Sequence, residues 1–558
     1  MESQKTKKKS VGAFIWRWLK RGLIGILLLW VALAIAVQIP AVQEFVIGEI
    51  TKQISGKTET TVKAKGFRLR LFNSLSLRGL YIEDHNGDTL LFANDFQVEF
   101  ENPIYSYIQG RDFLVKGVQL KSGGFYQRKR KGETQTNVEV FLDAFRSSAD
   151  TSGDSPNDSS SMGFAIDLNE VLLKDAEFVR QDSVAGSFQR FVIKDGLIVP
   201  ERIDFENREI SIKDVILESP RIELYSFPGT MMEFEENTRI NTLDPKGVGP
   251  DPWLVQCRQF SLSDGLFRRY NLIEDPDPSS VLGALDWQRL DLDQIFIDVS
   301  DFNLYNWNFD GCLHQLSVQS SSGLHITNFS ANYVHVDTNI VDLEGVQLET
   351  PGSEIIADVE LKYDAFTDFR EFKNEVDIHF LSQRTNIMIS DLIQFAPGLR
   401  KVRFFRESAN QLIKLSGDVQ GPVNKLKGEN FSLDLGRQTR LKGNFRSENL
   451  AEGDQAYLFA KIDQSTSNMT DLYRIIPDFS PPEDFKNLGS LNFRGKFEGA
   501  FKDFAAEGIL ISDIGKAEMK MKMDVKKGVD DAVYSGGLNL INFDLGALSD
   551  NSDLGRIN

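Results

Sequence analysis

From about residue 60 onward, the sequence alternates apolar and polar residues with the period of two that a β-strand imposes. In the segment LNFRGKFEG, one set of alternate positions is apolar and holds Leu491, Phe493 and Phe497. The positions between them are polar or charged. Successive side chains of a strand point to opposite faces of its sheet, so each such strand has one apolar and one wet face. The pattern therefore predicts an all-β body.

An apolar sheet face needs a cover, because large exposed apolar areas are rare unless they have a function. Short helical patterns occur only near residues 138–145 and 391–395, so few helices are expected to cover it. Two covers remain open: a second sheet, as in a closed sandwich, or lipid acyl chains in an open groove. The candidate groove residues are Ile413, Leu415, Val419, Leu491, Phe493, Phe497, Met519, Met521 and Met523.

Internal repeats indicate how the strands are organised. Segments that begin at Val115, Ile166 and Val255 share a hairpin-like pattern, in which a phenylalanine follows a predicted turn. Those phenylalanines are Phe125, Phe178 and Phe267. A longer unit recurs after about 80 residues, where Asp471-Leu472 matches Asp391-Leu392, and a third copy begins at Asp544. Because repeat arrays normally end in a capping unit, we expect the natural protein to continue beyond Asn558.

The N-terminus predicts a membrane anchor. A basic leader over residues 1–21 precedes an uncharged segment at 22–43, which is about the length that crosses the ~30 Å hydrocarbon core. The excess of Lys and Arg before this segment places the leader in the cytoplasm and the body outside it. The alternative is a cleaved signal peptide, since Ala32-Leu33-Ala34 resembles a cleavage site. Residues 44–56 have helical spacing of apolar residues, including Phe45, and predict a helix at the membrane surface.

Composition excludes several functions. The net charge is −18, so nucleic acid is not an expected partner. Cys257 and Cys312 match no metal motif, and both a disulfide and two free thiols remain open. We find no nucleotide loop, no zinc-binding histidine pair and no nucleophile elbow, so we expect no enzyme, no cofactor and no metal. A Ser/Asp-rich stretch at 147–162 predicts a flexible loop.

Several segments together resemble one known family. These are the basic leader with its single anchor, QIPAVQEFVIGEITKQISGKTETTV, LSLRGLYIEDHNGDTLLFANDFQVEF, and the repeats that end in FDLGALSDNSDLG. They are similar to the N-terminal part of TamB-type proteins, the inner-membrane component of the translocation and assembly module, especially in Bacteroidota. The wider relation is to AsmA-like proteins. The resemblance covers nearly all 558 residues but not the family's C-terminal domain.

The resemblance implies an elongated, taco-like antiparallel β-groove that bridges the inner and outer membranes and has no active site. It implies 60–385 as AsmA-like groove repeats and 386–558 as repeats of about 80 residues. The implied function is transport of phospholipid toward the outer membrane, as part of outer-membrane biogenesis. The implied partners are phospholipid acyl chains, the inner membrane and an outer-membrane assembly protein of the TamA or BamA type. The alternative is a scaffold for outer-membrane or secreted proteins, which pairs incoming strands at a sheet edge.

The anchor prediction can be tested with a reporter. Alkaline phosphatase fused after Ser55 should be active, because the charge asymmetry around residues 22–43 places that position in the periplasm. Low activity, or a mature N-terminus near Val37, would contradict an anchored protein with its body outside.

Overall fold

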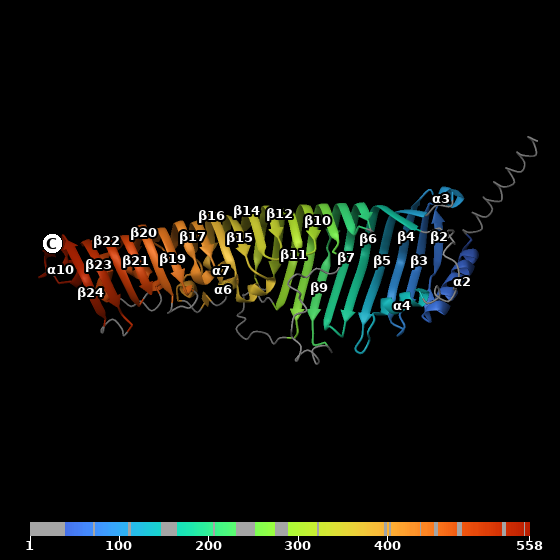
Figure 1. The fold of residues 1–558 in the computed structure, drawn as a ribbon, viewed down its shortest axis with the longest axis horizontal. Helices are drawn as coiled ribbons and strands as arrows, with labels where there is room; N and C mark the ends of the chain where they lie inside the picture. The colour runs from blue at the N-terminus through green and yellow to red at the C-terminus, as the bar shows by residue number, and fades with distance from the viewer. Residues whose placement is uncertain are drawn as a thin grey trace, which may run out of the picture. The chain divides into compact units, whose positions relative to one another are not determined.

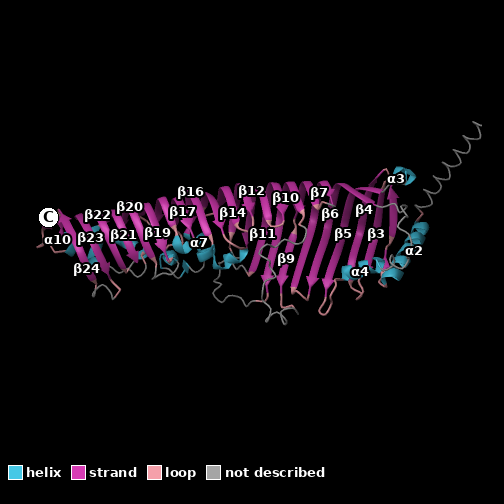
Figure 2. Ribbon diagram, viewed as in Figure 1, coloured by secondary structure: helices cyan, strands magenta, loops and turns pink. Residues whose placement is uncertain are grey.

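Strands dominate the computed structural model of the protein (Figure 2). The structure describes residues 39–70, 73–109, 113–146, 164–204, 207–229, 252–273, 288–320, 323–395, 399–400, 403–435, 437–450, 456–476, 482–500, 502–526, 532–551 and 553–558. Strands β1 to β24 belong to one hydrogen-bonded sheet, and β25 pairs with β26. The prediction of a mostly β fold is therefore confirmed.

The predicted leader and transmembrane segment lie outside the described residues, apart from residues 39–43. The transmembrane helix therefore stays a prediction. Within the described ranges, no helix is both long and apolar enough to span a membrane.

The chain divides into two compact units, and the first contains residues 1–197 and 229–234. Its elements are α2 (Pro40–Thr58), β1 (Val62–Lys63), β2 (Gly66–Arg70), β3 (Ser74–Glu83), β4 (Thr89–Glu101), α3 (Pro103–Gln109), β5 (Phe113–Lys129), α4 (Asn137–Arg146), β6 (Phe164–Asp182) and the first part of β7 (Ser187–Asp204). Strands β1 and β2 pair with β3, and the ladder continues through β4 and β5 to β6.

The second unit contains residues 198–228 and 235–558. Its strands after β7 are β8 (Glu209–Glu218), β9 (Arg221–Ser226), β10 (Leu254–Asn271), β11 (Arg289–Tyr305), β12 (Asn308–Ser320), β13 (His325–Val336), β14 (Ile340–Glu349), β15 (Glu354–Lys362), β16 (Asp377–Met388), β17 (Leu412–Gly421), β18 (Lys427–Leu435), β19 (Thr439–Glu448), β20 (Tyr457–Asn468), β21 (Ser490–Ala500), β22 (Asp503–Ser512), β23 (Gly515–Asp524), β24 (Val533–Ile541), β25 (Phe543–Asp544) and β26 (Arg556–Ile557). Its helices are η1 (Phe366–Glu371), α6 (Phe372–Glu375), α7 (Ile389–Phe395), α8 (Arg403–Glu407), η3 (Val423–Lys425), α9 (Met469–Ile475), η5 (Glu483–Leu488) and α10 (Leu545–Ser549). From β10 to β24, each strand pairs antiparallel with the next one (Figure 1).

Parallel strand pairs correct the prediction of a wholly antiparallel array. Strand β5 pairs parallel with β6, and β10 pairs parallel with both β8 and β9. A parallel pair needs a long connection, because the chain must return to the end of the sheet from which the first strand began. The connecting residues 130–163 and 227–253 include the Ser/Asp-rich stretch and a Pro- and Asp-rich stretch. The predicted loop at 147–162 lies outside the described residues.

The hairpin-like motifs are single long strands, so their predicted turns are wrong. They lie within β5, β6 and β10. The residues taken for turns are Ser122, Asp175 and Asp264, and their φ angles are 49°, 47° and 52°. A left-handed residue inside a strand interrupts the ladder and bends the strand. The polar turn signal therefore marks bends within continuous strands.

The recurring Asp-Leu pairs mark short helices that are fastened to a nearby hairpin turn. In α7, the Asp391 carboxylate accepts hydrogen bonds at 2.6 Å from the hydroxyls of both Thr350 and Ser353, in the turn between β14 and β15. In α9, buried Asp471 accepts a hydrogen bond at 2.8 Å from the backbone N–H of Gln438, in the turn between β18 and β19. In the third copy, Asp544 instead caps α10 by accepting from its backbone. The first two repeats thus use the same carboxylate clamp.

The cysteines lie on β10 and β12, and both are free thiols. Strand β11 separates their strands in the sheet. Two strand spacings of about 4.8 Å exceed the distance that a disulfide bridges. Burial raises the pKa of the Cys257 thiol, which therefore stays protonated at neutral pH.

Helix α2 covers the predicted juxtamembrane segment and extends it to Pro40–Thr58. Proline suits the first turn of a helix, where the backbone N–H has no helical partner. Among the side chains described on this helix, Ile47 is buried and Phe45 is 74% exposed. The placement of the helix at a membrane surface stays a prediction. Helix α2 contacts β1, β2 and α4.

Asp175 allows a test of the bends. Asp175→Gly should keep or slightly raise stability, whereas Asp175→Val should lower it by about 1–2 kcal/mol, because a β-branched residue disfavours positive φ. Lys174→Val, at the neighbouring exposed position, is the control and should change stability by less than about 1 kcal/mol. Urea unfolding measures the difference. Equal effects of the two valine substitutions would contradict the bend.

Candidate functional site

Side chains that stand opposite each other in a ladder lie on the same face of the sheet, so the strand register defines rows across it. One such row, the first apolar row, crosses β13 to β24 without a polar side chain. Its members are Val334, Leu343, Val359, Phe380, Val419, Gly428, Phe445, Ala460, Phe497, Ala506, Met521 and Gly536. The row follows the direction in which strands are added and is perpendicular to each strand.

A second apolar row runs from β8 to β20. It does not include β9, which pairs with a different part of β10. Its members are Leu217, Leu262, Ile297, Leu316, Phe329, Leu348, Ile355, Thr385, Leu415, Leu433, Leu441 and Ser465. The two hydroxyls bond within the protein: Thr385 to Ser382 at 2.8 Å, and Ser465 to the carbonyl oxygen of Phe493 at 3.0 Å. The row therefore stays apolar along its length.

The two rows share one face of the sheet. On β17, Leu415 and Val419 are four residues apart with no extra residue between them, so their side chains point the same way. Along β21, exposure alternates between the two faces of the sheet. Phe493 and Phe497, on the apolar face, are half-buried, whereas Arg494 and Lys496, on the other face, are exposed. The alternation predicted from the sequence is present there.

The nine candidate groove residues fall into two groups. Seven are half-buried on the sheet: Leu415, Val419, Phe493, Phe497, Met519, Met521 and Met523. The other two lie beneath short helices. Ile413 packs with Ile389 and Ile393 of α7 and with Phe404 of α8.

The second covered residue is Leu491, which packs with Leu488 of η5 and with Phe543. Leu545 and Leu548 of α10 also pack on this cluster. Helices and β25 thus cover the end of the apolar face that is nearest these two residues. Among the described residues, the other sheet is the two-stranded pair of β25 and β26, which is too small to be the second layer of a sandwich.

The first unit has apolar rows of its own. One of them crosses β2 to β6 and contains Phe67, Leu77, Phe96, Leu120 and Leu173. In another row, Phe125 stands opposite Phe178, and their ring centroids lie 5.8 Å apart. Two of the repeated phenylalanines noted in the sequence are therefore cross-strand partners.

The opposite face is charged. Two hollows over β22 to β24, of about 560 and 570 Å³, share Glu507, Lys520 and Gly537, which stand opposite one another. The first is also lined by Ala506, Met521 and Gly536 of the first apolar row. Lys520 and Glu507 lie 3.5 Å apart. In the described part of the chain, no cluster of His, Cys, Asp or Glu could hold a metal ion.

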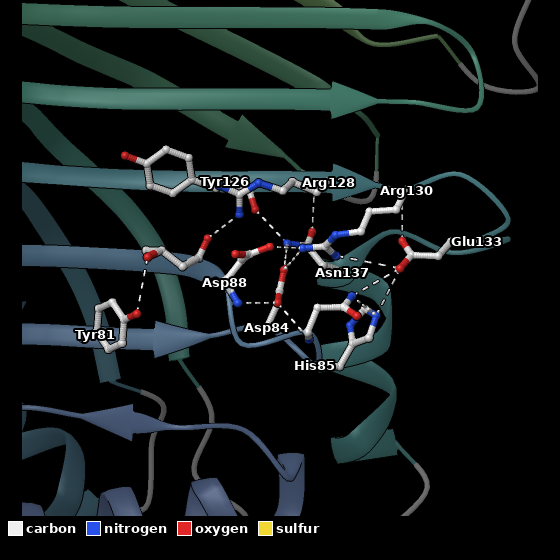
Figure 3. A network of polar contacts seen from close by, with 11 residues as sticks. Tyr81, Asp84, His85, Asp88, Tyr126, Arg128, Arg130, Glu133 and Asn137 are labelled. Carbon is white, nitrogen blue, oxygen red and sulfur yellow. Dashed lines mark hydrogen bonds and ion pairs between the residues drawn. The ribbon is translucent and has the colours of Figure 1, made fainter. Parts of the chain in front are cut away.

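A polar network fixes α4 at one end of the first unit's strands (Figure 3). Its centre is the buried carboxylate of Asp84 in the β3–β4 turn. This carboxylate accepts hydrogen bonds from the backbone N–H groups of Asn86 and Asp88, at 2.9 and 3.0 Å. It also accepts a bond at 3.1 Å from the amide of Asn137, the first residue of α4.

Arg130 completes this network. Its guanidinium pairs with Asp84 at 3.3 Å and also with Asp88. Burial alone would raise the pKa of Asp84, but the hydrogen bonds and the Arg130 charge outweigh it and lower the pKa below its usual range. The network therefore holds α4 against the β3–β4 turn.

Sequence reasoning found the alternating strands at 413–419, 491–497 and 519–523 but missed most members of the rows, including those of β8 to β15. Each missed strand has alternating apolar residues that could have been found. The alignment of these residues between strands could not have been found from the sequence, because register shifts at many strand pairs change which residues stand opposite each other.

Comparison with models of protein families gave no match, and no curated protein or solved structure matches the chain significantly.

Asp84 allows a test of the network. Asp84→Ala removes the acceptor of Asn137 and Arg130, so it should weaken the attachment of α4 by about 2 kcal/mol, or roughly 30-fold in amide exchange. Hydrogen exchange of residues 137–146, measured by mass spectrometry, is the readout. Asp88→Ala, in the same turn but exposed, should have an effect of at most about fivefold.

The same readout has a pH dependence. Because the folded-state pKa of Asp84 is lowered, its stabilising contribution is full above the unfolded value of 3.8 and is lost as the pH falls through the lower folded value. Unchanged exchange of α4 in Asp84→Ala would contradict the role of the network.

Proposed function

We propose that this protein is anchored in the inner membrane by residues 22–43 and moves phospholipid along the apolar face of its periplasmic sheet toward the outer membrane. The observation that carries the proposal is the first apolar row, which crosses twelve consecutive strands without a polar side chain. The resemblance to TamB-type and AsmA-like proteins supports the same function.

The physical argument concerns the cost of moving an acyl chain. Burying one CH₂ group away from water is favourable by about 0.8 kcal/mol, so an acyl chain that left the bilayer for water would lose this free energy for every CH₂ group exposed. On the apolar face, a step of one strand spacing, about 4.8 Å, replaces one apolar contact with another. From β13 to β24, the row extends over roughly 50 Å at this spacing. Movement along it therefore needs no chemical reaction, only a continuous apolar path.

The anchor and the charged face suit this function. A transmembrane segment at 22–43 would hold the first unit beside a source of phospholipid. The opposite face carries Lys496, Lys520 and Lys522, which are exposed and keep that side in water. An outer-membrane partner of the TamA or BamA type would receive the cargo.

Substitutions on the two faces of β21 test the conduit. Phe493→Asp places a carboxylate on the apolar face, where an unpaired charge is costly to acyl chains, whereas Arg494→Glu changes only the exposed face. Phe493→Asp should make cells sensitive to detergents and large antibiotics at a normal protein level, and Arg494→Glu should not. Equal sensitivity of the two variants would contradict the proposal.

Photo-crosslinking in cells gives a direct test of the cargo. A photoreactive residue at Leu415, Val419, Phe497 or Met521 should capture phospholipid, whereas one at Lys414, Arg494 or Lys496 should not. Protein adducts alone at the apolar positions would mean that another protein surface covers this face.

A further inference from the structure

Small and bulky residues alternate along the first apolar row from β18 to β24. In the order of the strands, these residues are Gly428, Phe445, Ala460, Phe497, Ala506, Met521 and Gly536. Every bulky residue therefore stands between two residues that have no side chain or only a methyl group. In a sheet that surrounds an interior, such alternation decides how much of the interior the side chains fill.

The ring of Phe445 lies over Gly428 of the neighbouring strand. A Cβ atom added to Gly428 would meet three atoms of this ring first, which are Cε1, Cδ1 at 2.6 Å and Cζ at 2.9 Å. Carbon atoms in contact are usually about 3.5–4.0 Å apart, so the ring occupies the space that a side chain at position 428 would need. Gly428 is accordingly buried, and Phe445 is half-buried. Phe431 of β18 supports the ring through an edge-to-face contact, with the centroids 4.9 Å apart.

Phe493 is arranged in the same way on β21. A Cβ atom on Gly495 would lie 2.9 Å from the Cζ atom of this ring, and one on Gly508 would lie 3.0 Å from its Cε2 atom. The ring therefore covers two glycines that stand opposite each other on β21 and β22. An aromatic ring that covers a glycine of a sheet shields the backbone there and is itself held down.

Ala460 shows the same feature between two rings. It stands opposite both Phe445 and Phe497 and is only 5% exposed. Its burial agrees with neighbouring rings that lie along the sheet and cover the methyl group.

We infer that the small residues of the first apolar row allow its bulky side chains to lie flat on the sheet, so that together they form a smooth floor over which an acyl chain passes. Gly428 is a positioning residue for the Phe445 ring. A methyl group at position 428 would force this ring into another rotamer, and because the sheet lies beneath it, the ring would rise into the path. This inference rests on the proposed function and adds to it the residues that keep the path open.

The substitution Gly428→Ala tests the inference in the full-length protein in living cells. The nearest atoms to the new methyl group all belong to the Phe445 ring, so the substitution displaces a side chain and leaves the backbone in place. A photoreactive residue is placed at Leu343 on β14 or, in a separate protein, at Met521 on β23. Phospholipid capture at Met521 should fall about tenfold relative to capture at Leu343, because lipid that arrives from the inner membrane meets the raised ring before it reaches β23.

Two further variants, compared at equal protein level, make the test specific. Gly428→Ala combined with Phe445→Ala removes the displaced ring and should restore most of the capture at Met521. Gly537→Ala adds the same methyl group on the opposite face of β24, where no atom of the described residues lies within 4 Å of it. It should leave capture at both positions unchanged.

The outcomes separate the inference from the proposed function. Capture at Met521 that stays unchanged in Gly428→Ala, or that falls equally at Leu343, would overturn the inference and leave the conduit standing, since a general loss of structure affects both sides of position 428. Failure of Phe445→Ala to restore capture would also overturn it, because the methyl group would not act through the ring. The absence of phospholipid at both positions of the unsubstituted protein would overturn the proposed function as well.

Discussion

The strand register is the constraint on which the candidate site depends. A single strand with alternating residues has only a narrow apolar face. Such faces join into a continuous apolar path only when each neighbouring strand places an apolar residue directly opposite. In the second unit this occurs eleven times in succession along the first apolar row, from Val334 to Gly536. A slip of one residue at any pair would move a charged residue such as Lys461 or Lys520 into the row, because the side-chain period is two.

Irregular positions preserve this register. Shifts occur at many strand pairs, including β16 with β17 and β17 with β18. On β18, Asn430 has a φ of 49° at the shift, which absorbs one extra residue and returns Gly428 to the position opposite Val419. Left-handed residues within strands thus bend the sheet and also keep the apolar rows aligned. The polar character of these residues follows from the backbone, since Asn and Asp tolerate this conformation better than most residues.

Carboxylates fasten short helices to the sheet. The clamp between Asp391 and the β14–β15 turn, and the clamp between Asp471 and the β18–β19 turn, fasten α7 and α9 at the same end of the strands. These helices cover part of the apolar face at that end, where they bury Ile413 and Leu491. In the first unit, the Asp84 network fixes α4 with the same chemistry, a buried carboxylate that accepts backbone and side-chain N–H groups.

The sequence alone determined the strand content, the two faces of strands such as β21 and β23, and the short helix near Asp391, because each of these depends on residues close together in the chain. The Asp-Leu recurrence was visible at Asp471, but the helix there was not predicted. It did not reveal the parallel pairs of β5 with β6 and of β8 with β10, and it mistook the bends at Ser122, Asp175 and Asp264 for turns. A residue with positive φ looks the same in sequence whether the chain reverses or only bends. Which residues stand opposite one another, and so which side chains join into a row, depends on hydrogen bonds between strands, and only the tertiary structure decided it.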